Sequence, residues 1–297
     1  GTSQDTPRIS TDDELPPDFN EELDETTIEE EESLETSATI DDGENAATDG
    51  LPDLASFLIK SACKDAALAN YLYWYLKVEV DSYHWRDTTA ATGAQPNAEK
   101  ATLRAMYGTV LRRLNRALGR GGLEAKRRAT LLTKQQLFVN QLVEIMKAVA
   151  KESGNRKKKI DFLKSRLAVH DKSLDLSNLG GLPLPLDPSV RVQAVMADRA
   201  SLFNSNLMPC KLTFRTADNR QYVTMFKRGD DLRQDQLVIQ MIRLMDKLLR
   251  AENLDLRLTP YQVLATSVQD GFVQFIDGSP LRDVIAEWST IQASSRL

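Results

Sequence analysis

The sequence predicts an α+β protein in which a helical region precedes antiparallel strands and one long helix. Two observations lead to this class. Over residues 51–175, apolar residues recur at steps of three and four, as they do along helices. Beyond residue 192 they alternate with polar residues, as in strands, and the helical spacing returns only over 231–250.

The first 50 residues differ sharply from the rest in charge. They contain 18 acidic residues and a single basic one, Arg8, which leaves 25 acidic and 37 basic residues for the remainder of the chain. A segment with so much like charge and so few bulky apolar side chains cannot bury enough surface to fold. We therefore expect residues 1–50 to be a disordered acidic segment, followed by a folded body that tolerates anionic ligands.

Composition also limits the classes of protein to consider. Cys63 and Cys210 lie far apart in the sequence, so we expect neither a disulfide framework nor a zinc site, and a reducing, cytoplasmic environment. No apolar run approaches the roughly 20 residues that span a bilayer, so any membrane contact is expected to be peripheral. We find no nucleic-acid-binding motif and expect no nucleic-acid partner, whereas nucleotide or lipid phosphates suit the basic body.

Consecutive amphipathic helices joined by polar turns are expected over residues 51–175, as in a helical solenoid. Asp53 is positioned to cap the first of them. The basic run 156–159 is expected to be a solvated helix start and not a lipid-binding patch. The four predicted helical stretches lie in 51–80, 102–119, 130–152 and 157–170.

The stretch "LSNLGGLPLPLDPSVRV", residues 176–192, interrupts the helical pattern. Its prolines and paired glycines cannot continue a helix, and Leu-Pro alternation favours extended backbone. We therefore expect a linker over 176–192 and a second domain over 193–297.

Two hairpins and a helix are expected in this second domain. "CKLTFRT" and "QYVTMFK" alternate around the turn "ADNR", and "YQVLATS" and "FVQFI" flank a second turn. The helix over 231–250 separates the two hairpins. The result is an order of two strands, one helix and two strands.

One lysine and one aspartate in this domain point to chemistry. Alternation along the strand places Lys227 on the same face as Val223 and Met225. Helical spacing places Asp235 on the apolar stripe of the following helix, where an isolated charge needs a partner. Lys227 is the natural candidate. The pair would either hold the phosphates of a nucleotide or form a purely structural ion pair, and spacing alone leaves both interpretations open.

Six strings in the two regions are distinctive: "FKRGDDLRQDQL", "PLPLDPSV", "LFNSNLMP", "LDLRLTPYQVLATS", "GFVQFI" and "LANYLYWYLKVEV". Together they resemble the phosphatidylinositol 3-kinases and, among them, the class III enzymes. The resemblance covers roughly residues 51–285 and implies the end of a helical (accessory) domain, over 51–175, followed by a kinase small lobe.

Carried over residue by residue, the resemblance implies an ATP site. Lys227 would contact the phosphates, Asp235 would hold that lysine, and Tyr261 would lie deep in the pocket beside Asp235. Ser205 would lie at the tip of the phosphate loop. The adenine would meet the side chains of Phe203 and Met225 and the segment formed by Val273, Gln274 and Ile276, with Gln274 and Ile276 offering main-chain groups to its edge. Met225 and Val273 also suit plain core positions.

The resemblance also shows what this sequence does not contain. The family uses an Asp-Arg-His loop with a metal-binding Asn, and an Asp-Phe-Gly loop for magnesium, and neither motif occurs here. We therefore assign no catalytic residue and no metal ligand, and expect Mg²⁺ or Mn²⁺ for the complete enzyme only. We expect the chain to be a truncated small lobe that is inactive by itself.

For the whole protein, the resemblance implies transfer of the ATP γ-phosphate to the 3-hydroxyl of phosphatidylinositol. It further implies peripheral action on endosomal, vacuolar or lysosomal and autophagosomal membranes, in trafficking and autophagy. The partners implied are a regulatory pseudokinase-type subunit and a coiled-coil subunit of autophagy or sorting. The alternatives are a non-catalytic scaffold and a related phosphatidylinositol 4-kinase.

Overall fold

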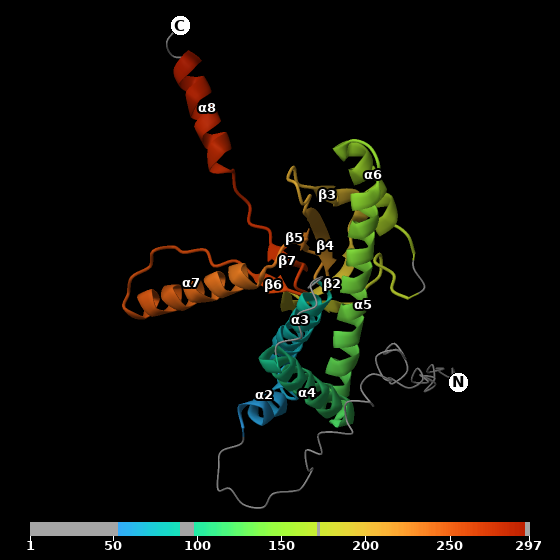
Figure 1. Ribbon diagram of the computed structural model, residues 1–297. Helices are drawn as coiled ribbons and strands as arrows, with labels where there is room; N and C mark the ends of the chain where they lie inside the picture. The colour runs from blue at the N-terminus through green and yellow to red at the C-terminus, as the bar shows by residue number, and fades with distance from the viewer. Residues whose placement is uncertain (1–52, 90–97, 171–172, 295–297) are drawn as a thin grey trace, which may run out of the picture. The chain divides into compact units, whose positions relative to one another are not determined.

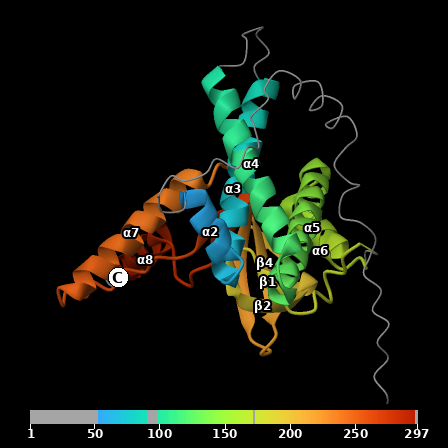
Figure 2. The ribbon, with the colours of Figure 1, turned by 90° about the horizontal axis from the view of Figure 1, so that it is seen from below.

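The computed structural model describes residues 53–89, 98–170 and 173–294 of the chain. The acidic segment 1–50, which we expect to be disordered, lies outside these ranges. Within them the chain forms helices and one antiparallel sheet (Figure 1; Figure 2), so the α+β class is confirmed. No helix within the described ranges is long and apolar enough to cross a membrane.

In the described part of the chain, five helices precede the sheet, and each packs against the next along the chain. The Asp53 carboxylate accepts the main-chain N–H of Ser56 at 2.6 Å, so the predicted cap is confirmed. Asn155 caps the last helix in the same way, through the N–H of Lys158 at 3.0 Å. The helices are α2 (Leu54–Ala62), α3 (Ala66–Thr89), α4 (Ala98–Arg120), α5 (Leu123–Lys151) and α6 (Arg156–Leu167).

The strands form one sheet in the order β1-β2-β4-β5-β7-β6, with β3 paired to β4. All the pairings are antiparallel, and both predicted hairpins are present, as β4–β5 and β6–β7. The strands are β1 (Leu182–Leu184), β2 (Asp187–Val195), β3 (Ser201–Leu202), β4 (Cys210–Thr216), β5 (Gln221–Arg228), β6 (Val263–Ala265) and β7 (Asp270–Gln274).

The expected linker over 176–192 is wrong for most of its length. From residue 182 onwards it forms β1 and the first part of β2, and Leu182, Leu184 and Leu186 are buried. Pro183 fits in β1 because this strand is at the edge of the sheet, where one row of N–H groups has no strand to bond. The boundary between two domains stays a prediction.

Two further helices complete the described fold. Helix α7 (Arg233–Ala251) confirms the predicted helix over 231–250, and α8 (Leu281–Ser294) follows β7. The side chain of Gln236 joins α7 to the sheet, because its Oε1 accepts the N–H of Ala265 at 3.0 Å. Within α7, Ile239 is the one buried residue, and other apolar side chains of this helix, such as those of Met241 and Leu244, are exposed.

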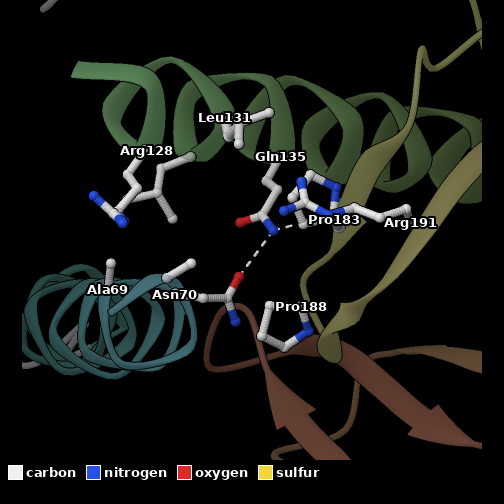
Figure 3. A pocket seen from close by; sticks show the side chains of 10 residues that line it. Ala69, Asn70, Arg128, Leu131, Gln135, Pro183, Pro188 and Arg191 are labelled. Atoms are coloured by element: carbon white, nitrogen blue, oxygen red, sulfur yellow. Dashed lines mark hydrogen bonds between the residues drawn. The ribbon is translucent and has the colours of Figure 1, made fainter. Parts of the chain in front are cut away.

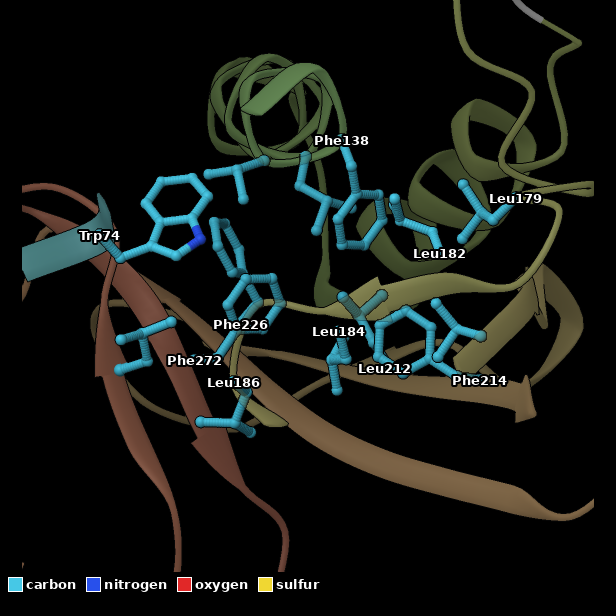
Figure 4. Close-up of a cluster of buried hydrophobic side chains, with 14 of the residues drawn as sticks. Trp74, Phe138, Leu179, Leu182, Leu184, Leu186, Leu212, Phe214, Phe226 and Phe272 are labelled. Atoms are coloured by element: carbon cyan, nitrogen blue, oxygen red, sulfur yellow. The ribbon is translucent and has the colours of Figure 1, made fainter. Parts of the chain in front are cut away.

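The main core lies between α5 and one face of the sheet (Figure 4). The ring of Phe138 in α5 is 6.0 Å from that of Phe214 in β4 and 6.2 Å from that of Phe272 in β7. Phe272 in turn lies 4.8 Å from Phe226 in β5. All four rings are completely buried, so the helical region and the sheet share one continuous core.

A small cavity of about 30 Å³ lies where α3 and α5 meet the β1–β2 hairpin (Figure 3). At its wall, Gln135 donates to Asn70 Oδ1 at 2.8 Å and to the carbonyl of Pro183 at 2.9 Å. Gln135 also accepts the indole N–H of Trp74 at 3.1 Å. These buried bonds connect two helices to the edge of the sheet, away from every residue proposed for nucleotide binding.

Candidate nucleotide-binding site

The two faces of the sheet differ in burial along β5. Thr224 and Phe226 are fully buried, and Phe226 packs into the core beneath α5. Val223, Met225 and Lys227 alternate with them and are half-buried, so they lie on the opposite face, as the alternation predicted. Lys227 is thus at the end of a strand on the face that α5 leaves uncovered.

The ammonium group of Lys227 is paired with Asp230 and not with Asp235. Its Nζ lies 2.9 Å from Asp230 Oδ2, and both side chains are about one-third exposed, at 26% and 37%. Gly229 makes this pair possible, because its φ of 85° turns the chain back after β5. The N–H groups of Gly229 and Asp230 both donate to the carbonyl of Gln269, which fixes the turn.

The predicted Lys227–Asp235 ion pair is therefore wrong in this structure. Asp235 is exposed in the first turn of α7, where a carboxylate is stabilised by water and by the positive end of the helix dipole without a cationic partner. The main-chain oxygen of Tyr261 accepts a bond from Arg243 at 3.3 Å. The predicted place of the Tyr261 ring beside Asp235 and its contact with a nucleotide stay predictions.

The predicted phosphate loop connects β3 to β4. Its base is closed by the N–H of Phe203, which donates to the Pro209 carbonyl at 2.9 Å. Within the loop the N–H of Ser205 donates to Phe203, and the N–H of Met208 donates to Ser205. Met208 adopts a φ of 42°. The Ser205 side chain is exposed, as a residue at the tip of a phosphate-binding loop should be.

The loop and the lysine are brought together at one point. A Cβ atom placed on Gly229 would lie 3.3 Å from Leu207 Cδ2. Leu207 is in the loop, and Gly229 is in the turn that holds Lys227 and Asp230. The loop therefore contacts the turn that follows Lys227, although Leu207 and Gly229 lie 22 positions apart in the sequence.

The segment predicted to meet the adenine edge is partly engaged with the protein itself. The N–H of Gln274 donates to the Gln262 carbonyl at 2.8 Å, and the Gln274 side chain accepts the N–H of Gln262 at 3.0 Å. The N–H of Gln274 is therefore occupied by Gln262, just before β6, and the predicted contact of Gln274 main-chain groups with the adenine edge stays a prediction. Ile276 is 44% exposed just beyond β7, and its contact with adenine stays a prediction.

Val273 lies opposite Met225 on the same face. It packs against a small second core formed by Val78 of α3, Leu232 and Ala265. The structure therefore gives Val273 the packing role that the sequence left open. Nucleotide contacts by Val273 and Met225 remain untested predictions.

Two residues of this face were missed by the sequence reasoning. Lys211 in β4 lies opposite Met225, and its Nζ is 4.0 Å from the centre of the Phe275 ring. The Phe275 ring is also 6.2 Å from that of Phe203. The alternation of "CKLTFRT" with "QYVTMFK" was the signal for Lys211, since it places Lys211 and Met225 in one row. No spacing rule indicated that Phe275 and Phe203 would meet.

The electrostatics on the other face of the same strands is different. The Asp270 carboxylate is mostly buried, accepts the Ser267 hydroxyl at 2.8 Å and lies 3.7 Å from Arg228 Nε. Burial raises the pKa of Asp270 above its ordinary value, against the opposing effects of Ser267 and Arg228. The two cations are similarly exposed, at 31% for Arg228 and 26% for Lys227, so the pairs differ in their acids: Asp270 is 12% exposed and Asp230 is 37% exposed.

The arrangement of residues fits the phosphates of a nucleotide. It offers a strand-end cation that water still reaches, an overlying loop with an exposed hydroxyl, and half-buried apolar side chains beside them. The described residues include no group of three or more His, Cys, Asp and Glu side chains placed to hold a metal ion.

A strand-end lysine followed by a turn that contacts the preceding loop, on an antiparallel sheet, is a feature of the small lobe of a kinase-type fold. Residues 221–294 match the family described as phosphatidylinositol 3- and 4-kinase. The matched part of the chain therefore belongs to this family.

Individual relatives extend the similarity into the helical region. A phosphatidylinositol 3-kinase of Schizosaccharomyces pombe, pik3, is 37% identical over 79% of this chain, and the phosphatidylinositol 3-kinase catalytic subunit type 3 of Caenorhabditis elegans is 39% identical over 78%. The phosphatidylinositol 3-kinase VPS34 of Saccharomyces cerevisiae is 34% identical over 84%. The resemblance to class III phosphatidylinositol 3-kinases is thereby confirmed. The chain spans about a quarter of the length of these curated relatives, at 27%, 25% and 26%.

Proposed function

We propose that this chain is part of an ATP-dependent lipid kinase, a transferase that moves the γ-phosphate of ATP to the 3-hydroxyl of phosphatidylinositol. The family match and the phosphatidylinositol 3-kinases among the relatives support a phosphoinositide substrate. One structural observation carries the proposal. The loop 203–209 contacts the turn that follows Lys227, on the face of the sheet opposite α5.

Lys227 would act on the phosphates of bound ATP. Phosphoryl transfer depends on positioning and on stabilising negative charge, so a cation fixed at a strand end is well suited to it. Asp230 restrains the ammonium group at 2.9 Å before the nucleotide binds. ATP supplies the phosphoryl group. The general base and the ligands of Mg²⁺ or Mn²⁺ would have to come from sequence that this chain does not contain.

We extend the proposal to the setting of the whole protein. Its lipid substrate requires peripheral contact with a membrane surface, and we place that contact on endosomes, the vacuole or lysosome, and autophagosomal membranes. The roles would be vesicular trafficking and autophagy. The partners would be a pseudokinase-type regulatory subunit and a coiled-coil subunit. The likeness to the named 3-kinases supports this setting.

The experiment is a lipid kinase assay with the whole protein and vesicles that contain phosphatidylinositol. Wild-type protein should form phosphatidylinositol 3-phosphate. Lys227→Met should abolish product while keeping the thermal unfolding temperature within a few degrees of wild type, because the methionine stem still packs beside Met225. Lys247→Met is the matched control, since Lys247 is an exposed lysine of α7 and should tolerate the same change.

The position of the new phosphate separates the alternatives. Phosphorylation at the 4-hydroxyl would identify a phosphatidylinositol 4-kinase. An absence of lipid product with every phosphoinositide would favour a non-catalytic scaffold. Near-normal activity of Lys227→Met would show that this lysine does not serve the phosphates.

A further inference from the structure

The basic run 156–159 forms the start of α6 and is exposed at three of its four residues, as predicted for a solvated helix start, but most of its side chains also contact the protein. Of its four side chains, Lys157 alone has no partner among the described residues. Lys158 pairs with Glu152 at 2.9 Å, and Lys159 donates to the Ala150 carbonyl at 3.1 Å, at the end of α5. Arg156 reaches furthest, to the main chain of Leu202 in the sheet.

Arg156 donates two hydrogen bonds to a single carbonyl oxygen. Its Nε lies 3.0 Å from the oxygen of Leu202, and its Nη2 donates to the same atom. A guanidinium presents these two N–H groups in one rigid plane, and hydrogen bonds from a charged donor are stronger than neutral ones. The contact joins residues 46 positions apart, from the helical region to the strand that enters the phosphate loop.

Leu202 needs such a donor because of its place in the sheet. Strand β3 pairs with β4 alone, so groups on its outer edge have no neighbouring strand. The next residue, Phe203, directs its N–H towards β4, to the Pro209 carbonyl. Since successive residues of a strand point their main-chain groups in opposite directions, the Leu202 carbonyl points outward. Arg156 satisfies this carbonyl.

The loop itself has few other anchors. The main-chain hydrogen bonds inside the loop are local: the N–H of Ser205 donates to Phe203 and the N–H of Met208 donates to Ser205. Residues 204–207 are exposed. A loop of this kind opens easily, so the fixed point at its entrance determines where its tip lies relative to Lys227.

We propose that Arg156 is a positioning residue for the phosphate loop. Through the Leu202 carbonyl, the helical region holds the loop 203–209 at the place where it meets the turn of Lys227. This inference rests on the proposed nucleotide-binding function and assigns the helical region a direct effect on nucleotide affinity. Arg156 does not touch the nucleotide; it fixes the entrance of a loop that does.

The test compares three variants by two independent measurements. Arg156→Ala removes both donors, Arg156→Lys retains the charge with a non-planar donor, and Lys157→Ala is the control, since it removes the same charge from the adjacent position of α6. Hydrogen–deuterium exchange of residues 202–209 in this chain reports the loop directly. The ATP dependence of the whole kinase reports the effect on the nucleotide.

Arg156→Ala should speed exchange at Phe203 and Met208 about tenfold and raise KM for ATP by a similar factor, with a smaller change in kcat. A factor of ten corresponds to 1.4 kcal/mol, which is within the range of hydrogen bonds to charged groups. Arg156→Lys should show smaller increases in exchange rate and in KM than Arg156→Ala, and Lys157→Ala should match wild type. A destabilised fold would speed exchange in α5 as well, so exchange confined to the loop separates positioning from unfolding.

Loop exchange in Arg156→Ala that equals wild type would overturn the proposal. So would a KM for ATP within twofold of wild type in an active kinase. Failure of the proposed function has a different signature: wild-type protein would neither bind nor use ATP, while the exchange difference between Arg156→Ala and Lys157→Ala would still show whether Arg156 holds the loop.

Discussion

The buried amide of Gln135 offers the sharpest test of how the helices are joined to the sheet. Its side chain is 1% exposed and makes three hydrogen bonds, at 3.1 Å with Trp74, 2.8 Å with Asn70 and 2.9 Å with Pro183 (Figure 3). Replacing it by leucine keeps a side chain of similar size and removes all three bonds. The perturbation is therefore electrostatic and leaves the packing volume nearly unchanged.

The magnitude follows from the partners left behind. The Trp74 N–H, the Asn70 oxygen and the Pro183 carbonyl would each remain buried without this partner, at about 1 kcal/mol or more apiece. The total is about 3 kcal/mol. A shift of 2–4 °C per kcal/mol is typical of domains of about 150–250 residues, so the melting temperature should fall by roughly 6–12 °C. A water molecule in the adjoining cavity of about 30 Å³ would reduce the loss towards the lower figure.

Thermal unfolding followed by circular dichroism measures this loss, with Gln136→Leu as the matched control. Gln136 is the next residue in α5 and accepts a single hydrogen bond, from the Tyr73 hydroxyl at 2.7 Å. Its replacement should lower the melting temperature by about a third as much. The reasoning is refuted if Gln135→Leu melts within 2 °C of wild type, or no lower than Gln136→Leu.

Three further changes test other contacts. Asp230→Asn should weaken the ion pair with Lys227 and raise KM for ATP more than Asp235→Asn does, because the structure pairs Lys227 with Asp230. Steady-state kinetics measures both KM values, and a larger increase for Asp235→Asn would support pairing of Lys227 with Asp235. Arg233→Met should cost about 1–2 kcal/mol and speed amide exchange at the start of α7, since Arg233 Nη1 bonds Ser82 at 2.8 Å; equal melting temperatures would contradict it. The His170 hydrogen bond, and then Ser177, lower the pKa of Asp175 to about 2, so stability from this carboxylate is present above its ordinary pKa of 3.8 and lost as pH falls towards 2. Carbon-13 NMR should find Asp175 ionised at pH 3 in wild type and more protonated in His170→Ala, where only the Ser177 hydrogen bonds still lower its pKa, and identical titrations would contradict the assignment.

The strands and the face of Lys227 could be predicted because a strand has a strict period of two. "QYVTMFK" contains enough alternation to place Val223, Met225 and Lys227 on one face, and the structure agrees. The partner of Lys227 could not be found this way. It depends on the positive φ of Gly229, which directs Asp230 back towards the strand. Helical spacing indicated the position of Asp235 around α7. It could not indicate that this side of α7 is exposed to solvent at Asp235.

The Leu-Pro stretch was misread for a related reason. Prolines within a run argue against a strand only when both edges of that strand are paired. "LPLPL" lies at the edge of the sheet, where Pro183 gives up no ladder bond, and its alternate leucines enter the core. Whether a strand is central or at an edge depends on the order of strands, which is not local information.

The shared core explains why the helical region bears on the nucleotide site at all. A sheet of this kind must cover one face with apolar side chains, and here α5 does so, with Phe138 against Phe214 and Phe272 (Figure 4). The other face of the same strands carries Lys227. Because a close-packed interior transmits small displacements, a shift of α5 moves β5 and β7 as a unit. It also moves α6, which follows α5 in the chain, and with it Arg156 at the entrance of the phosphate loop. The lysine and the loop therefore have one common support, so the helices before the sheet are as much a part of the nucleotide site's geometry as the strands that carry its side chains.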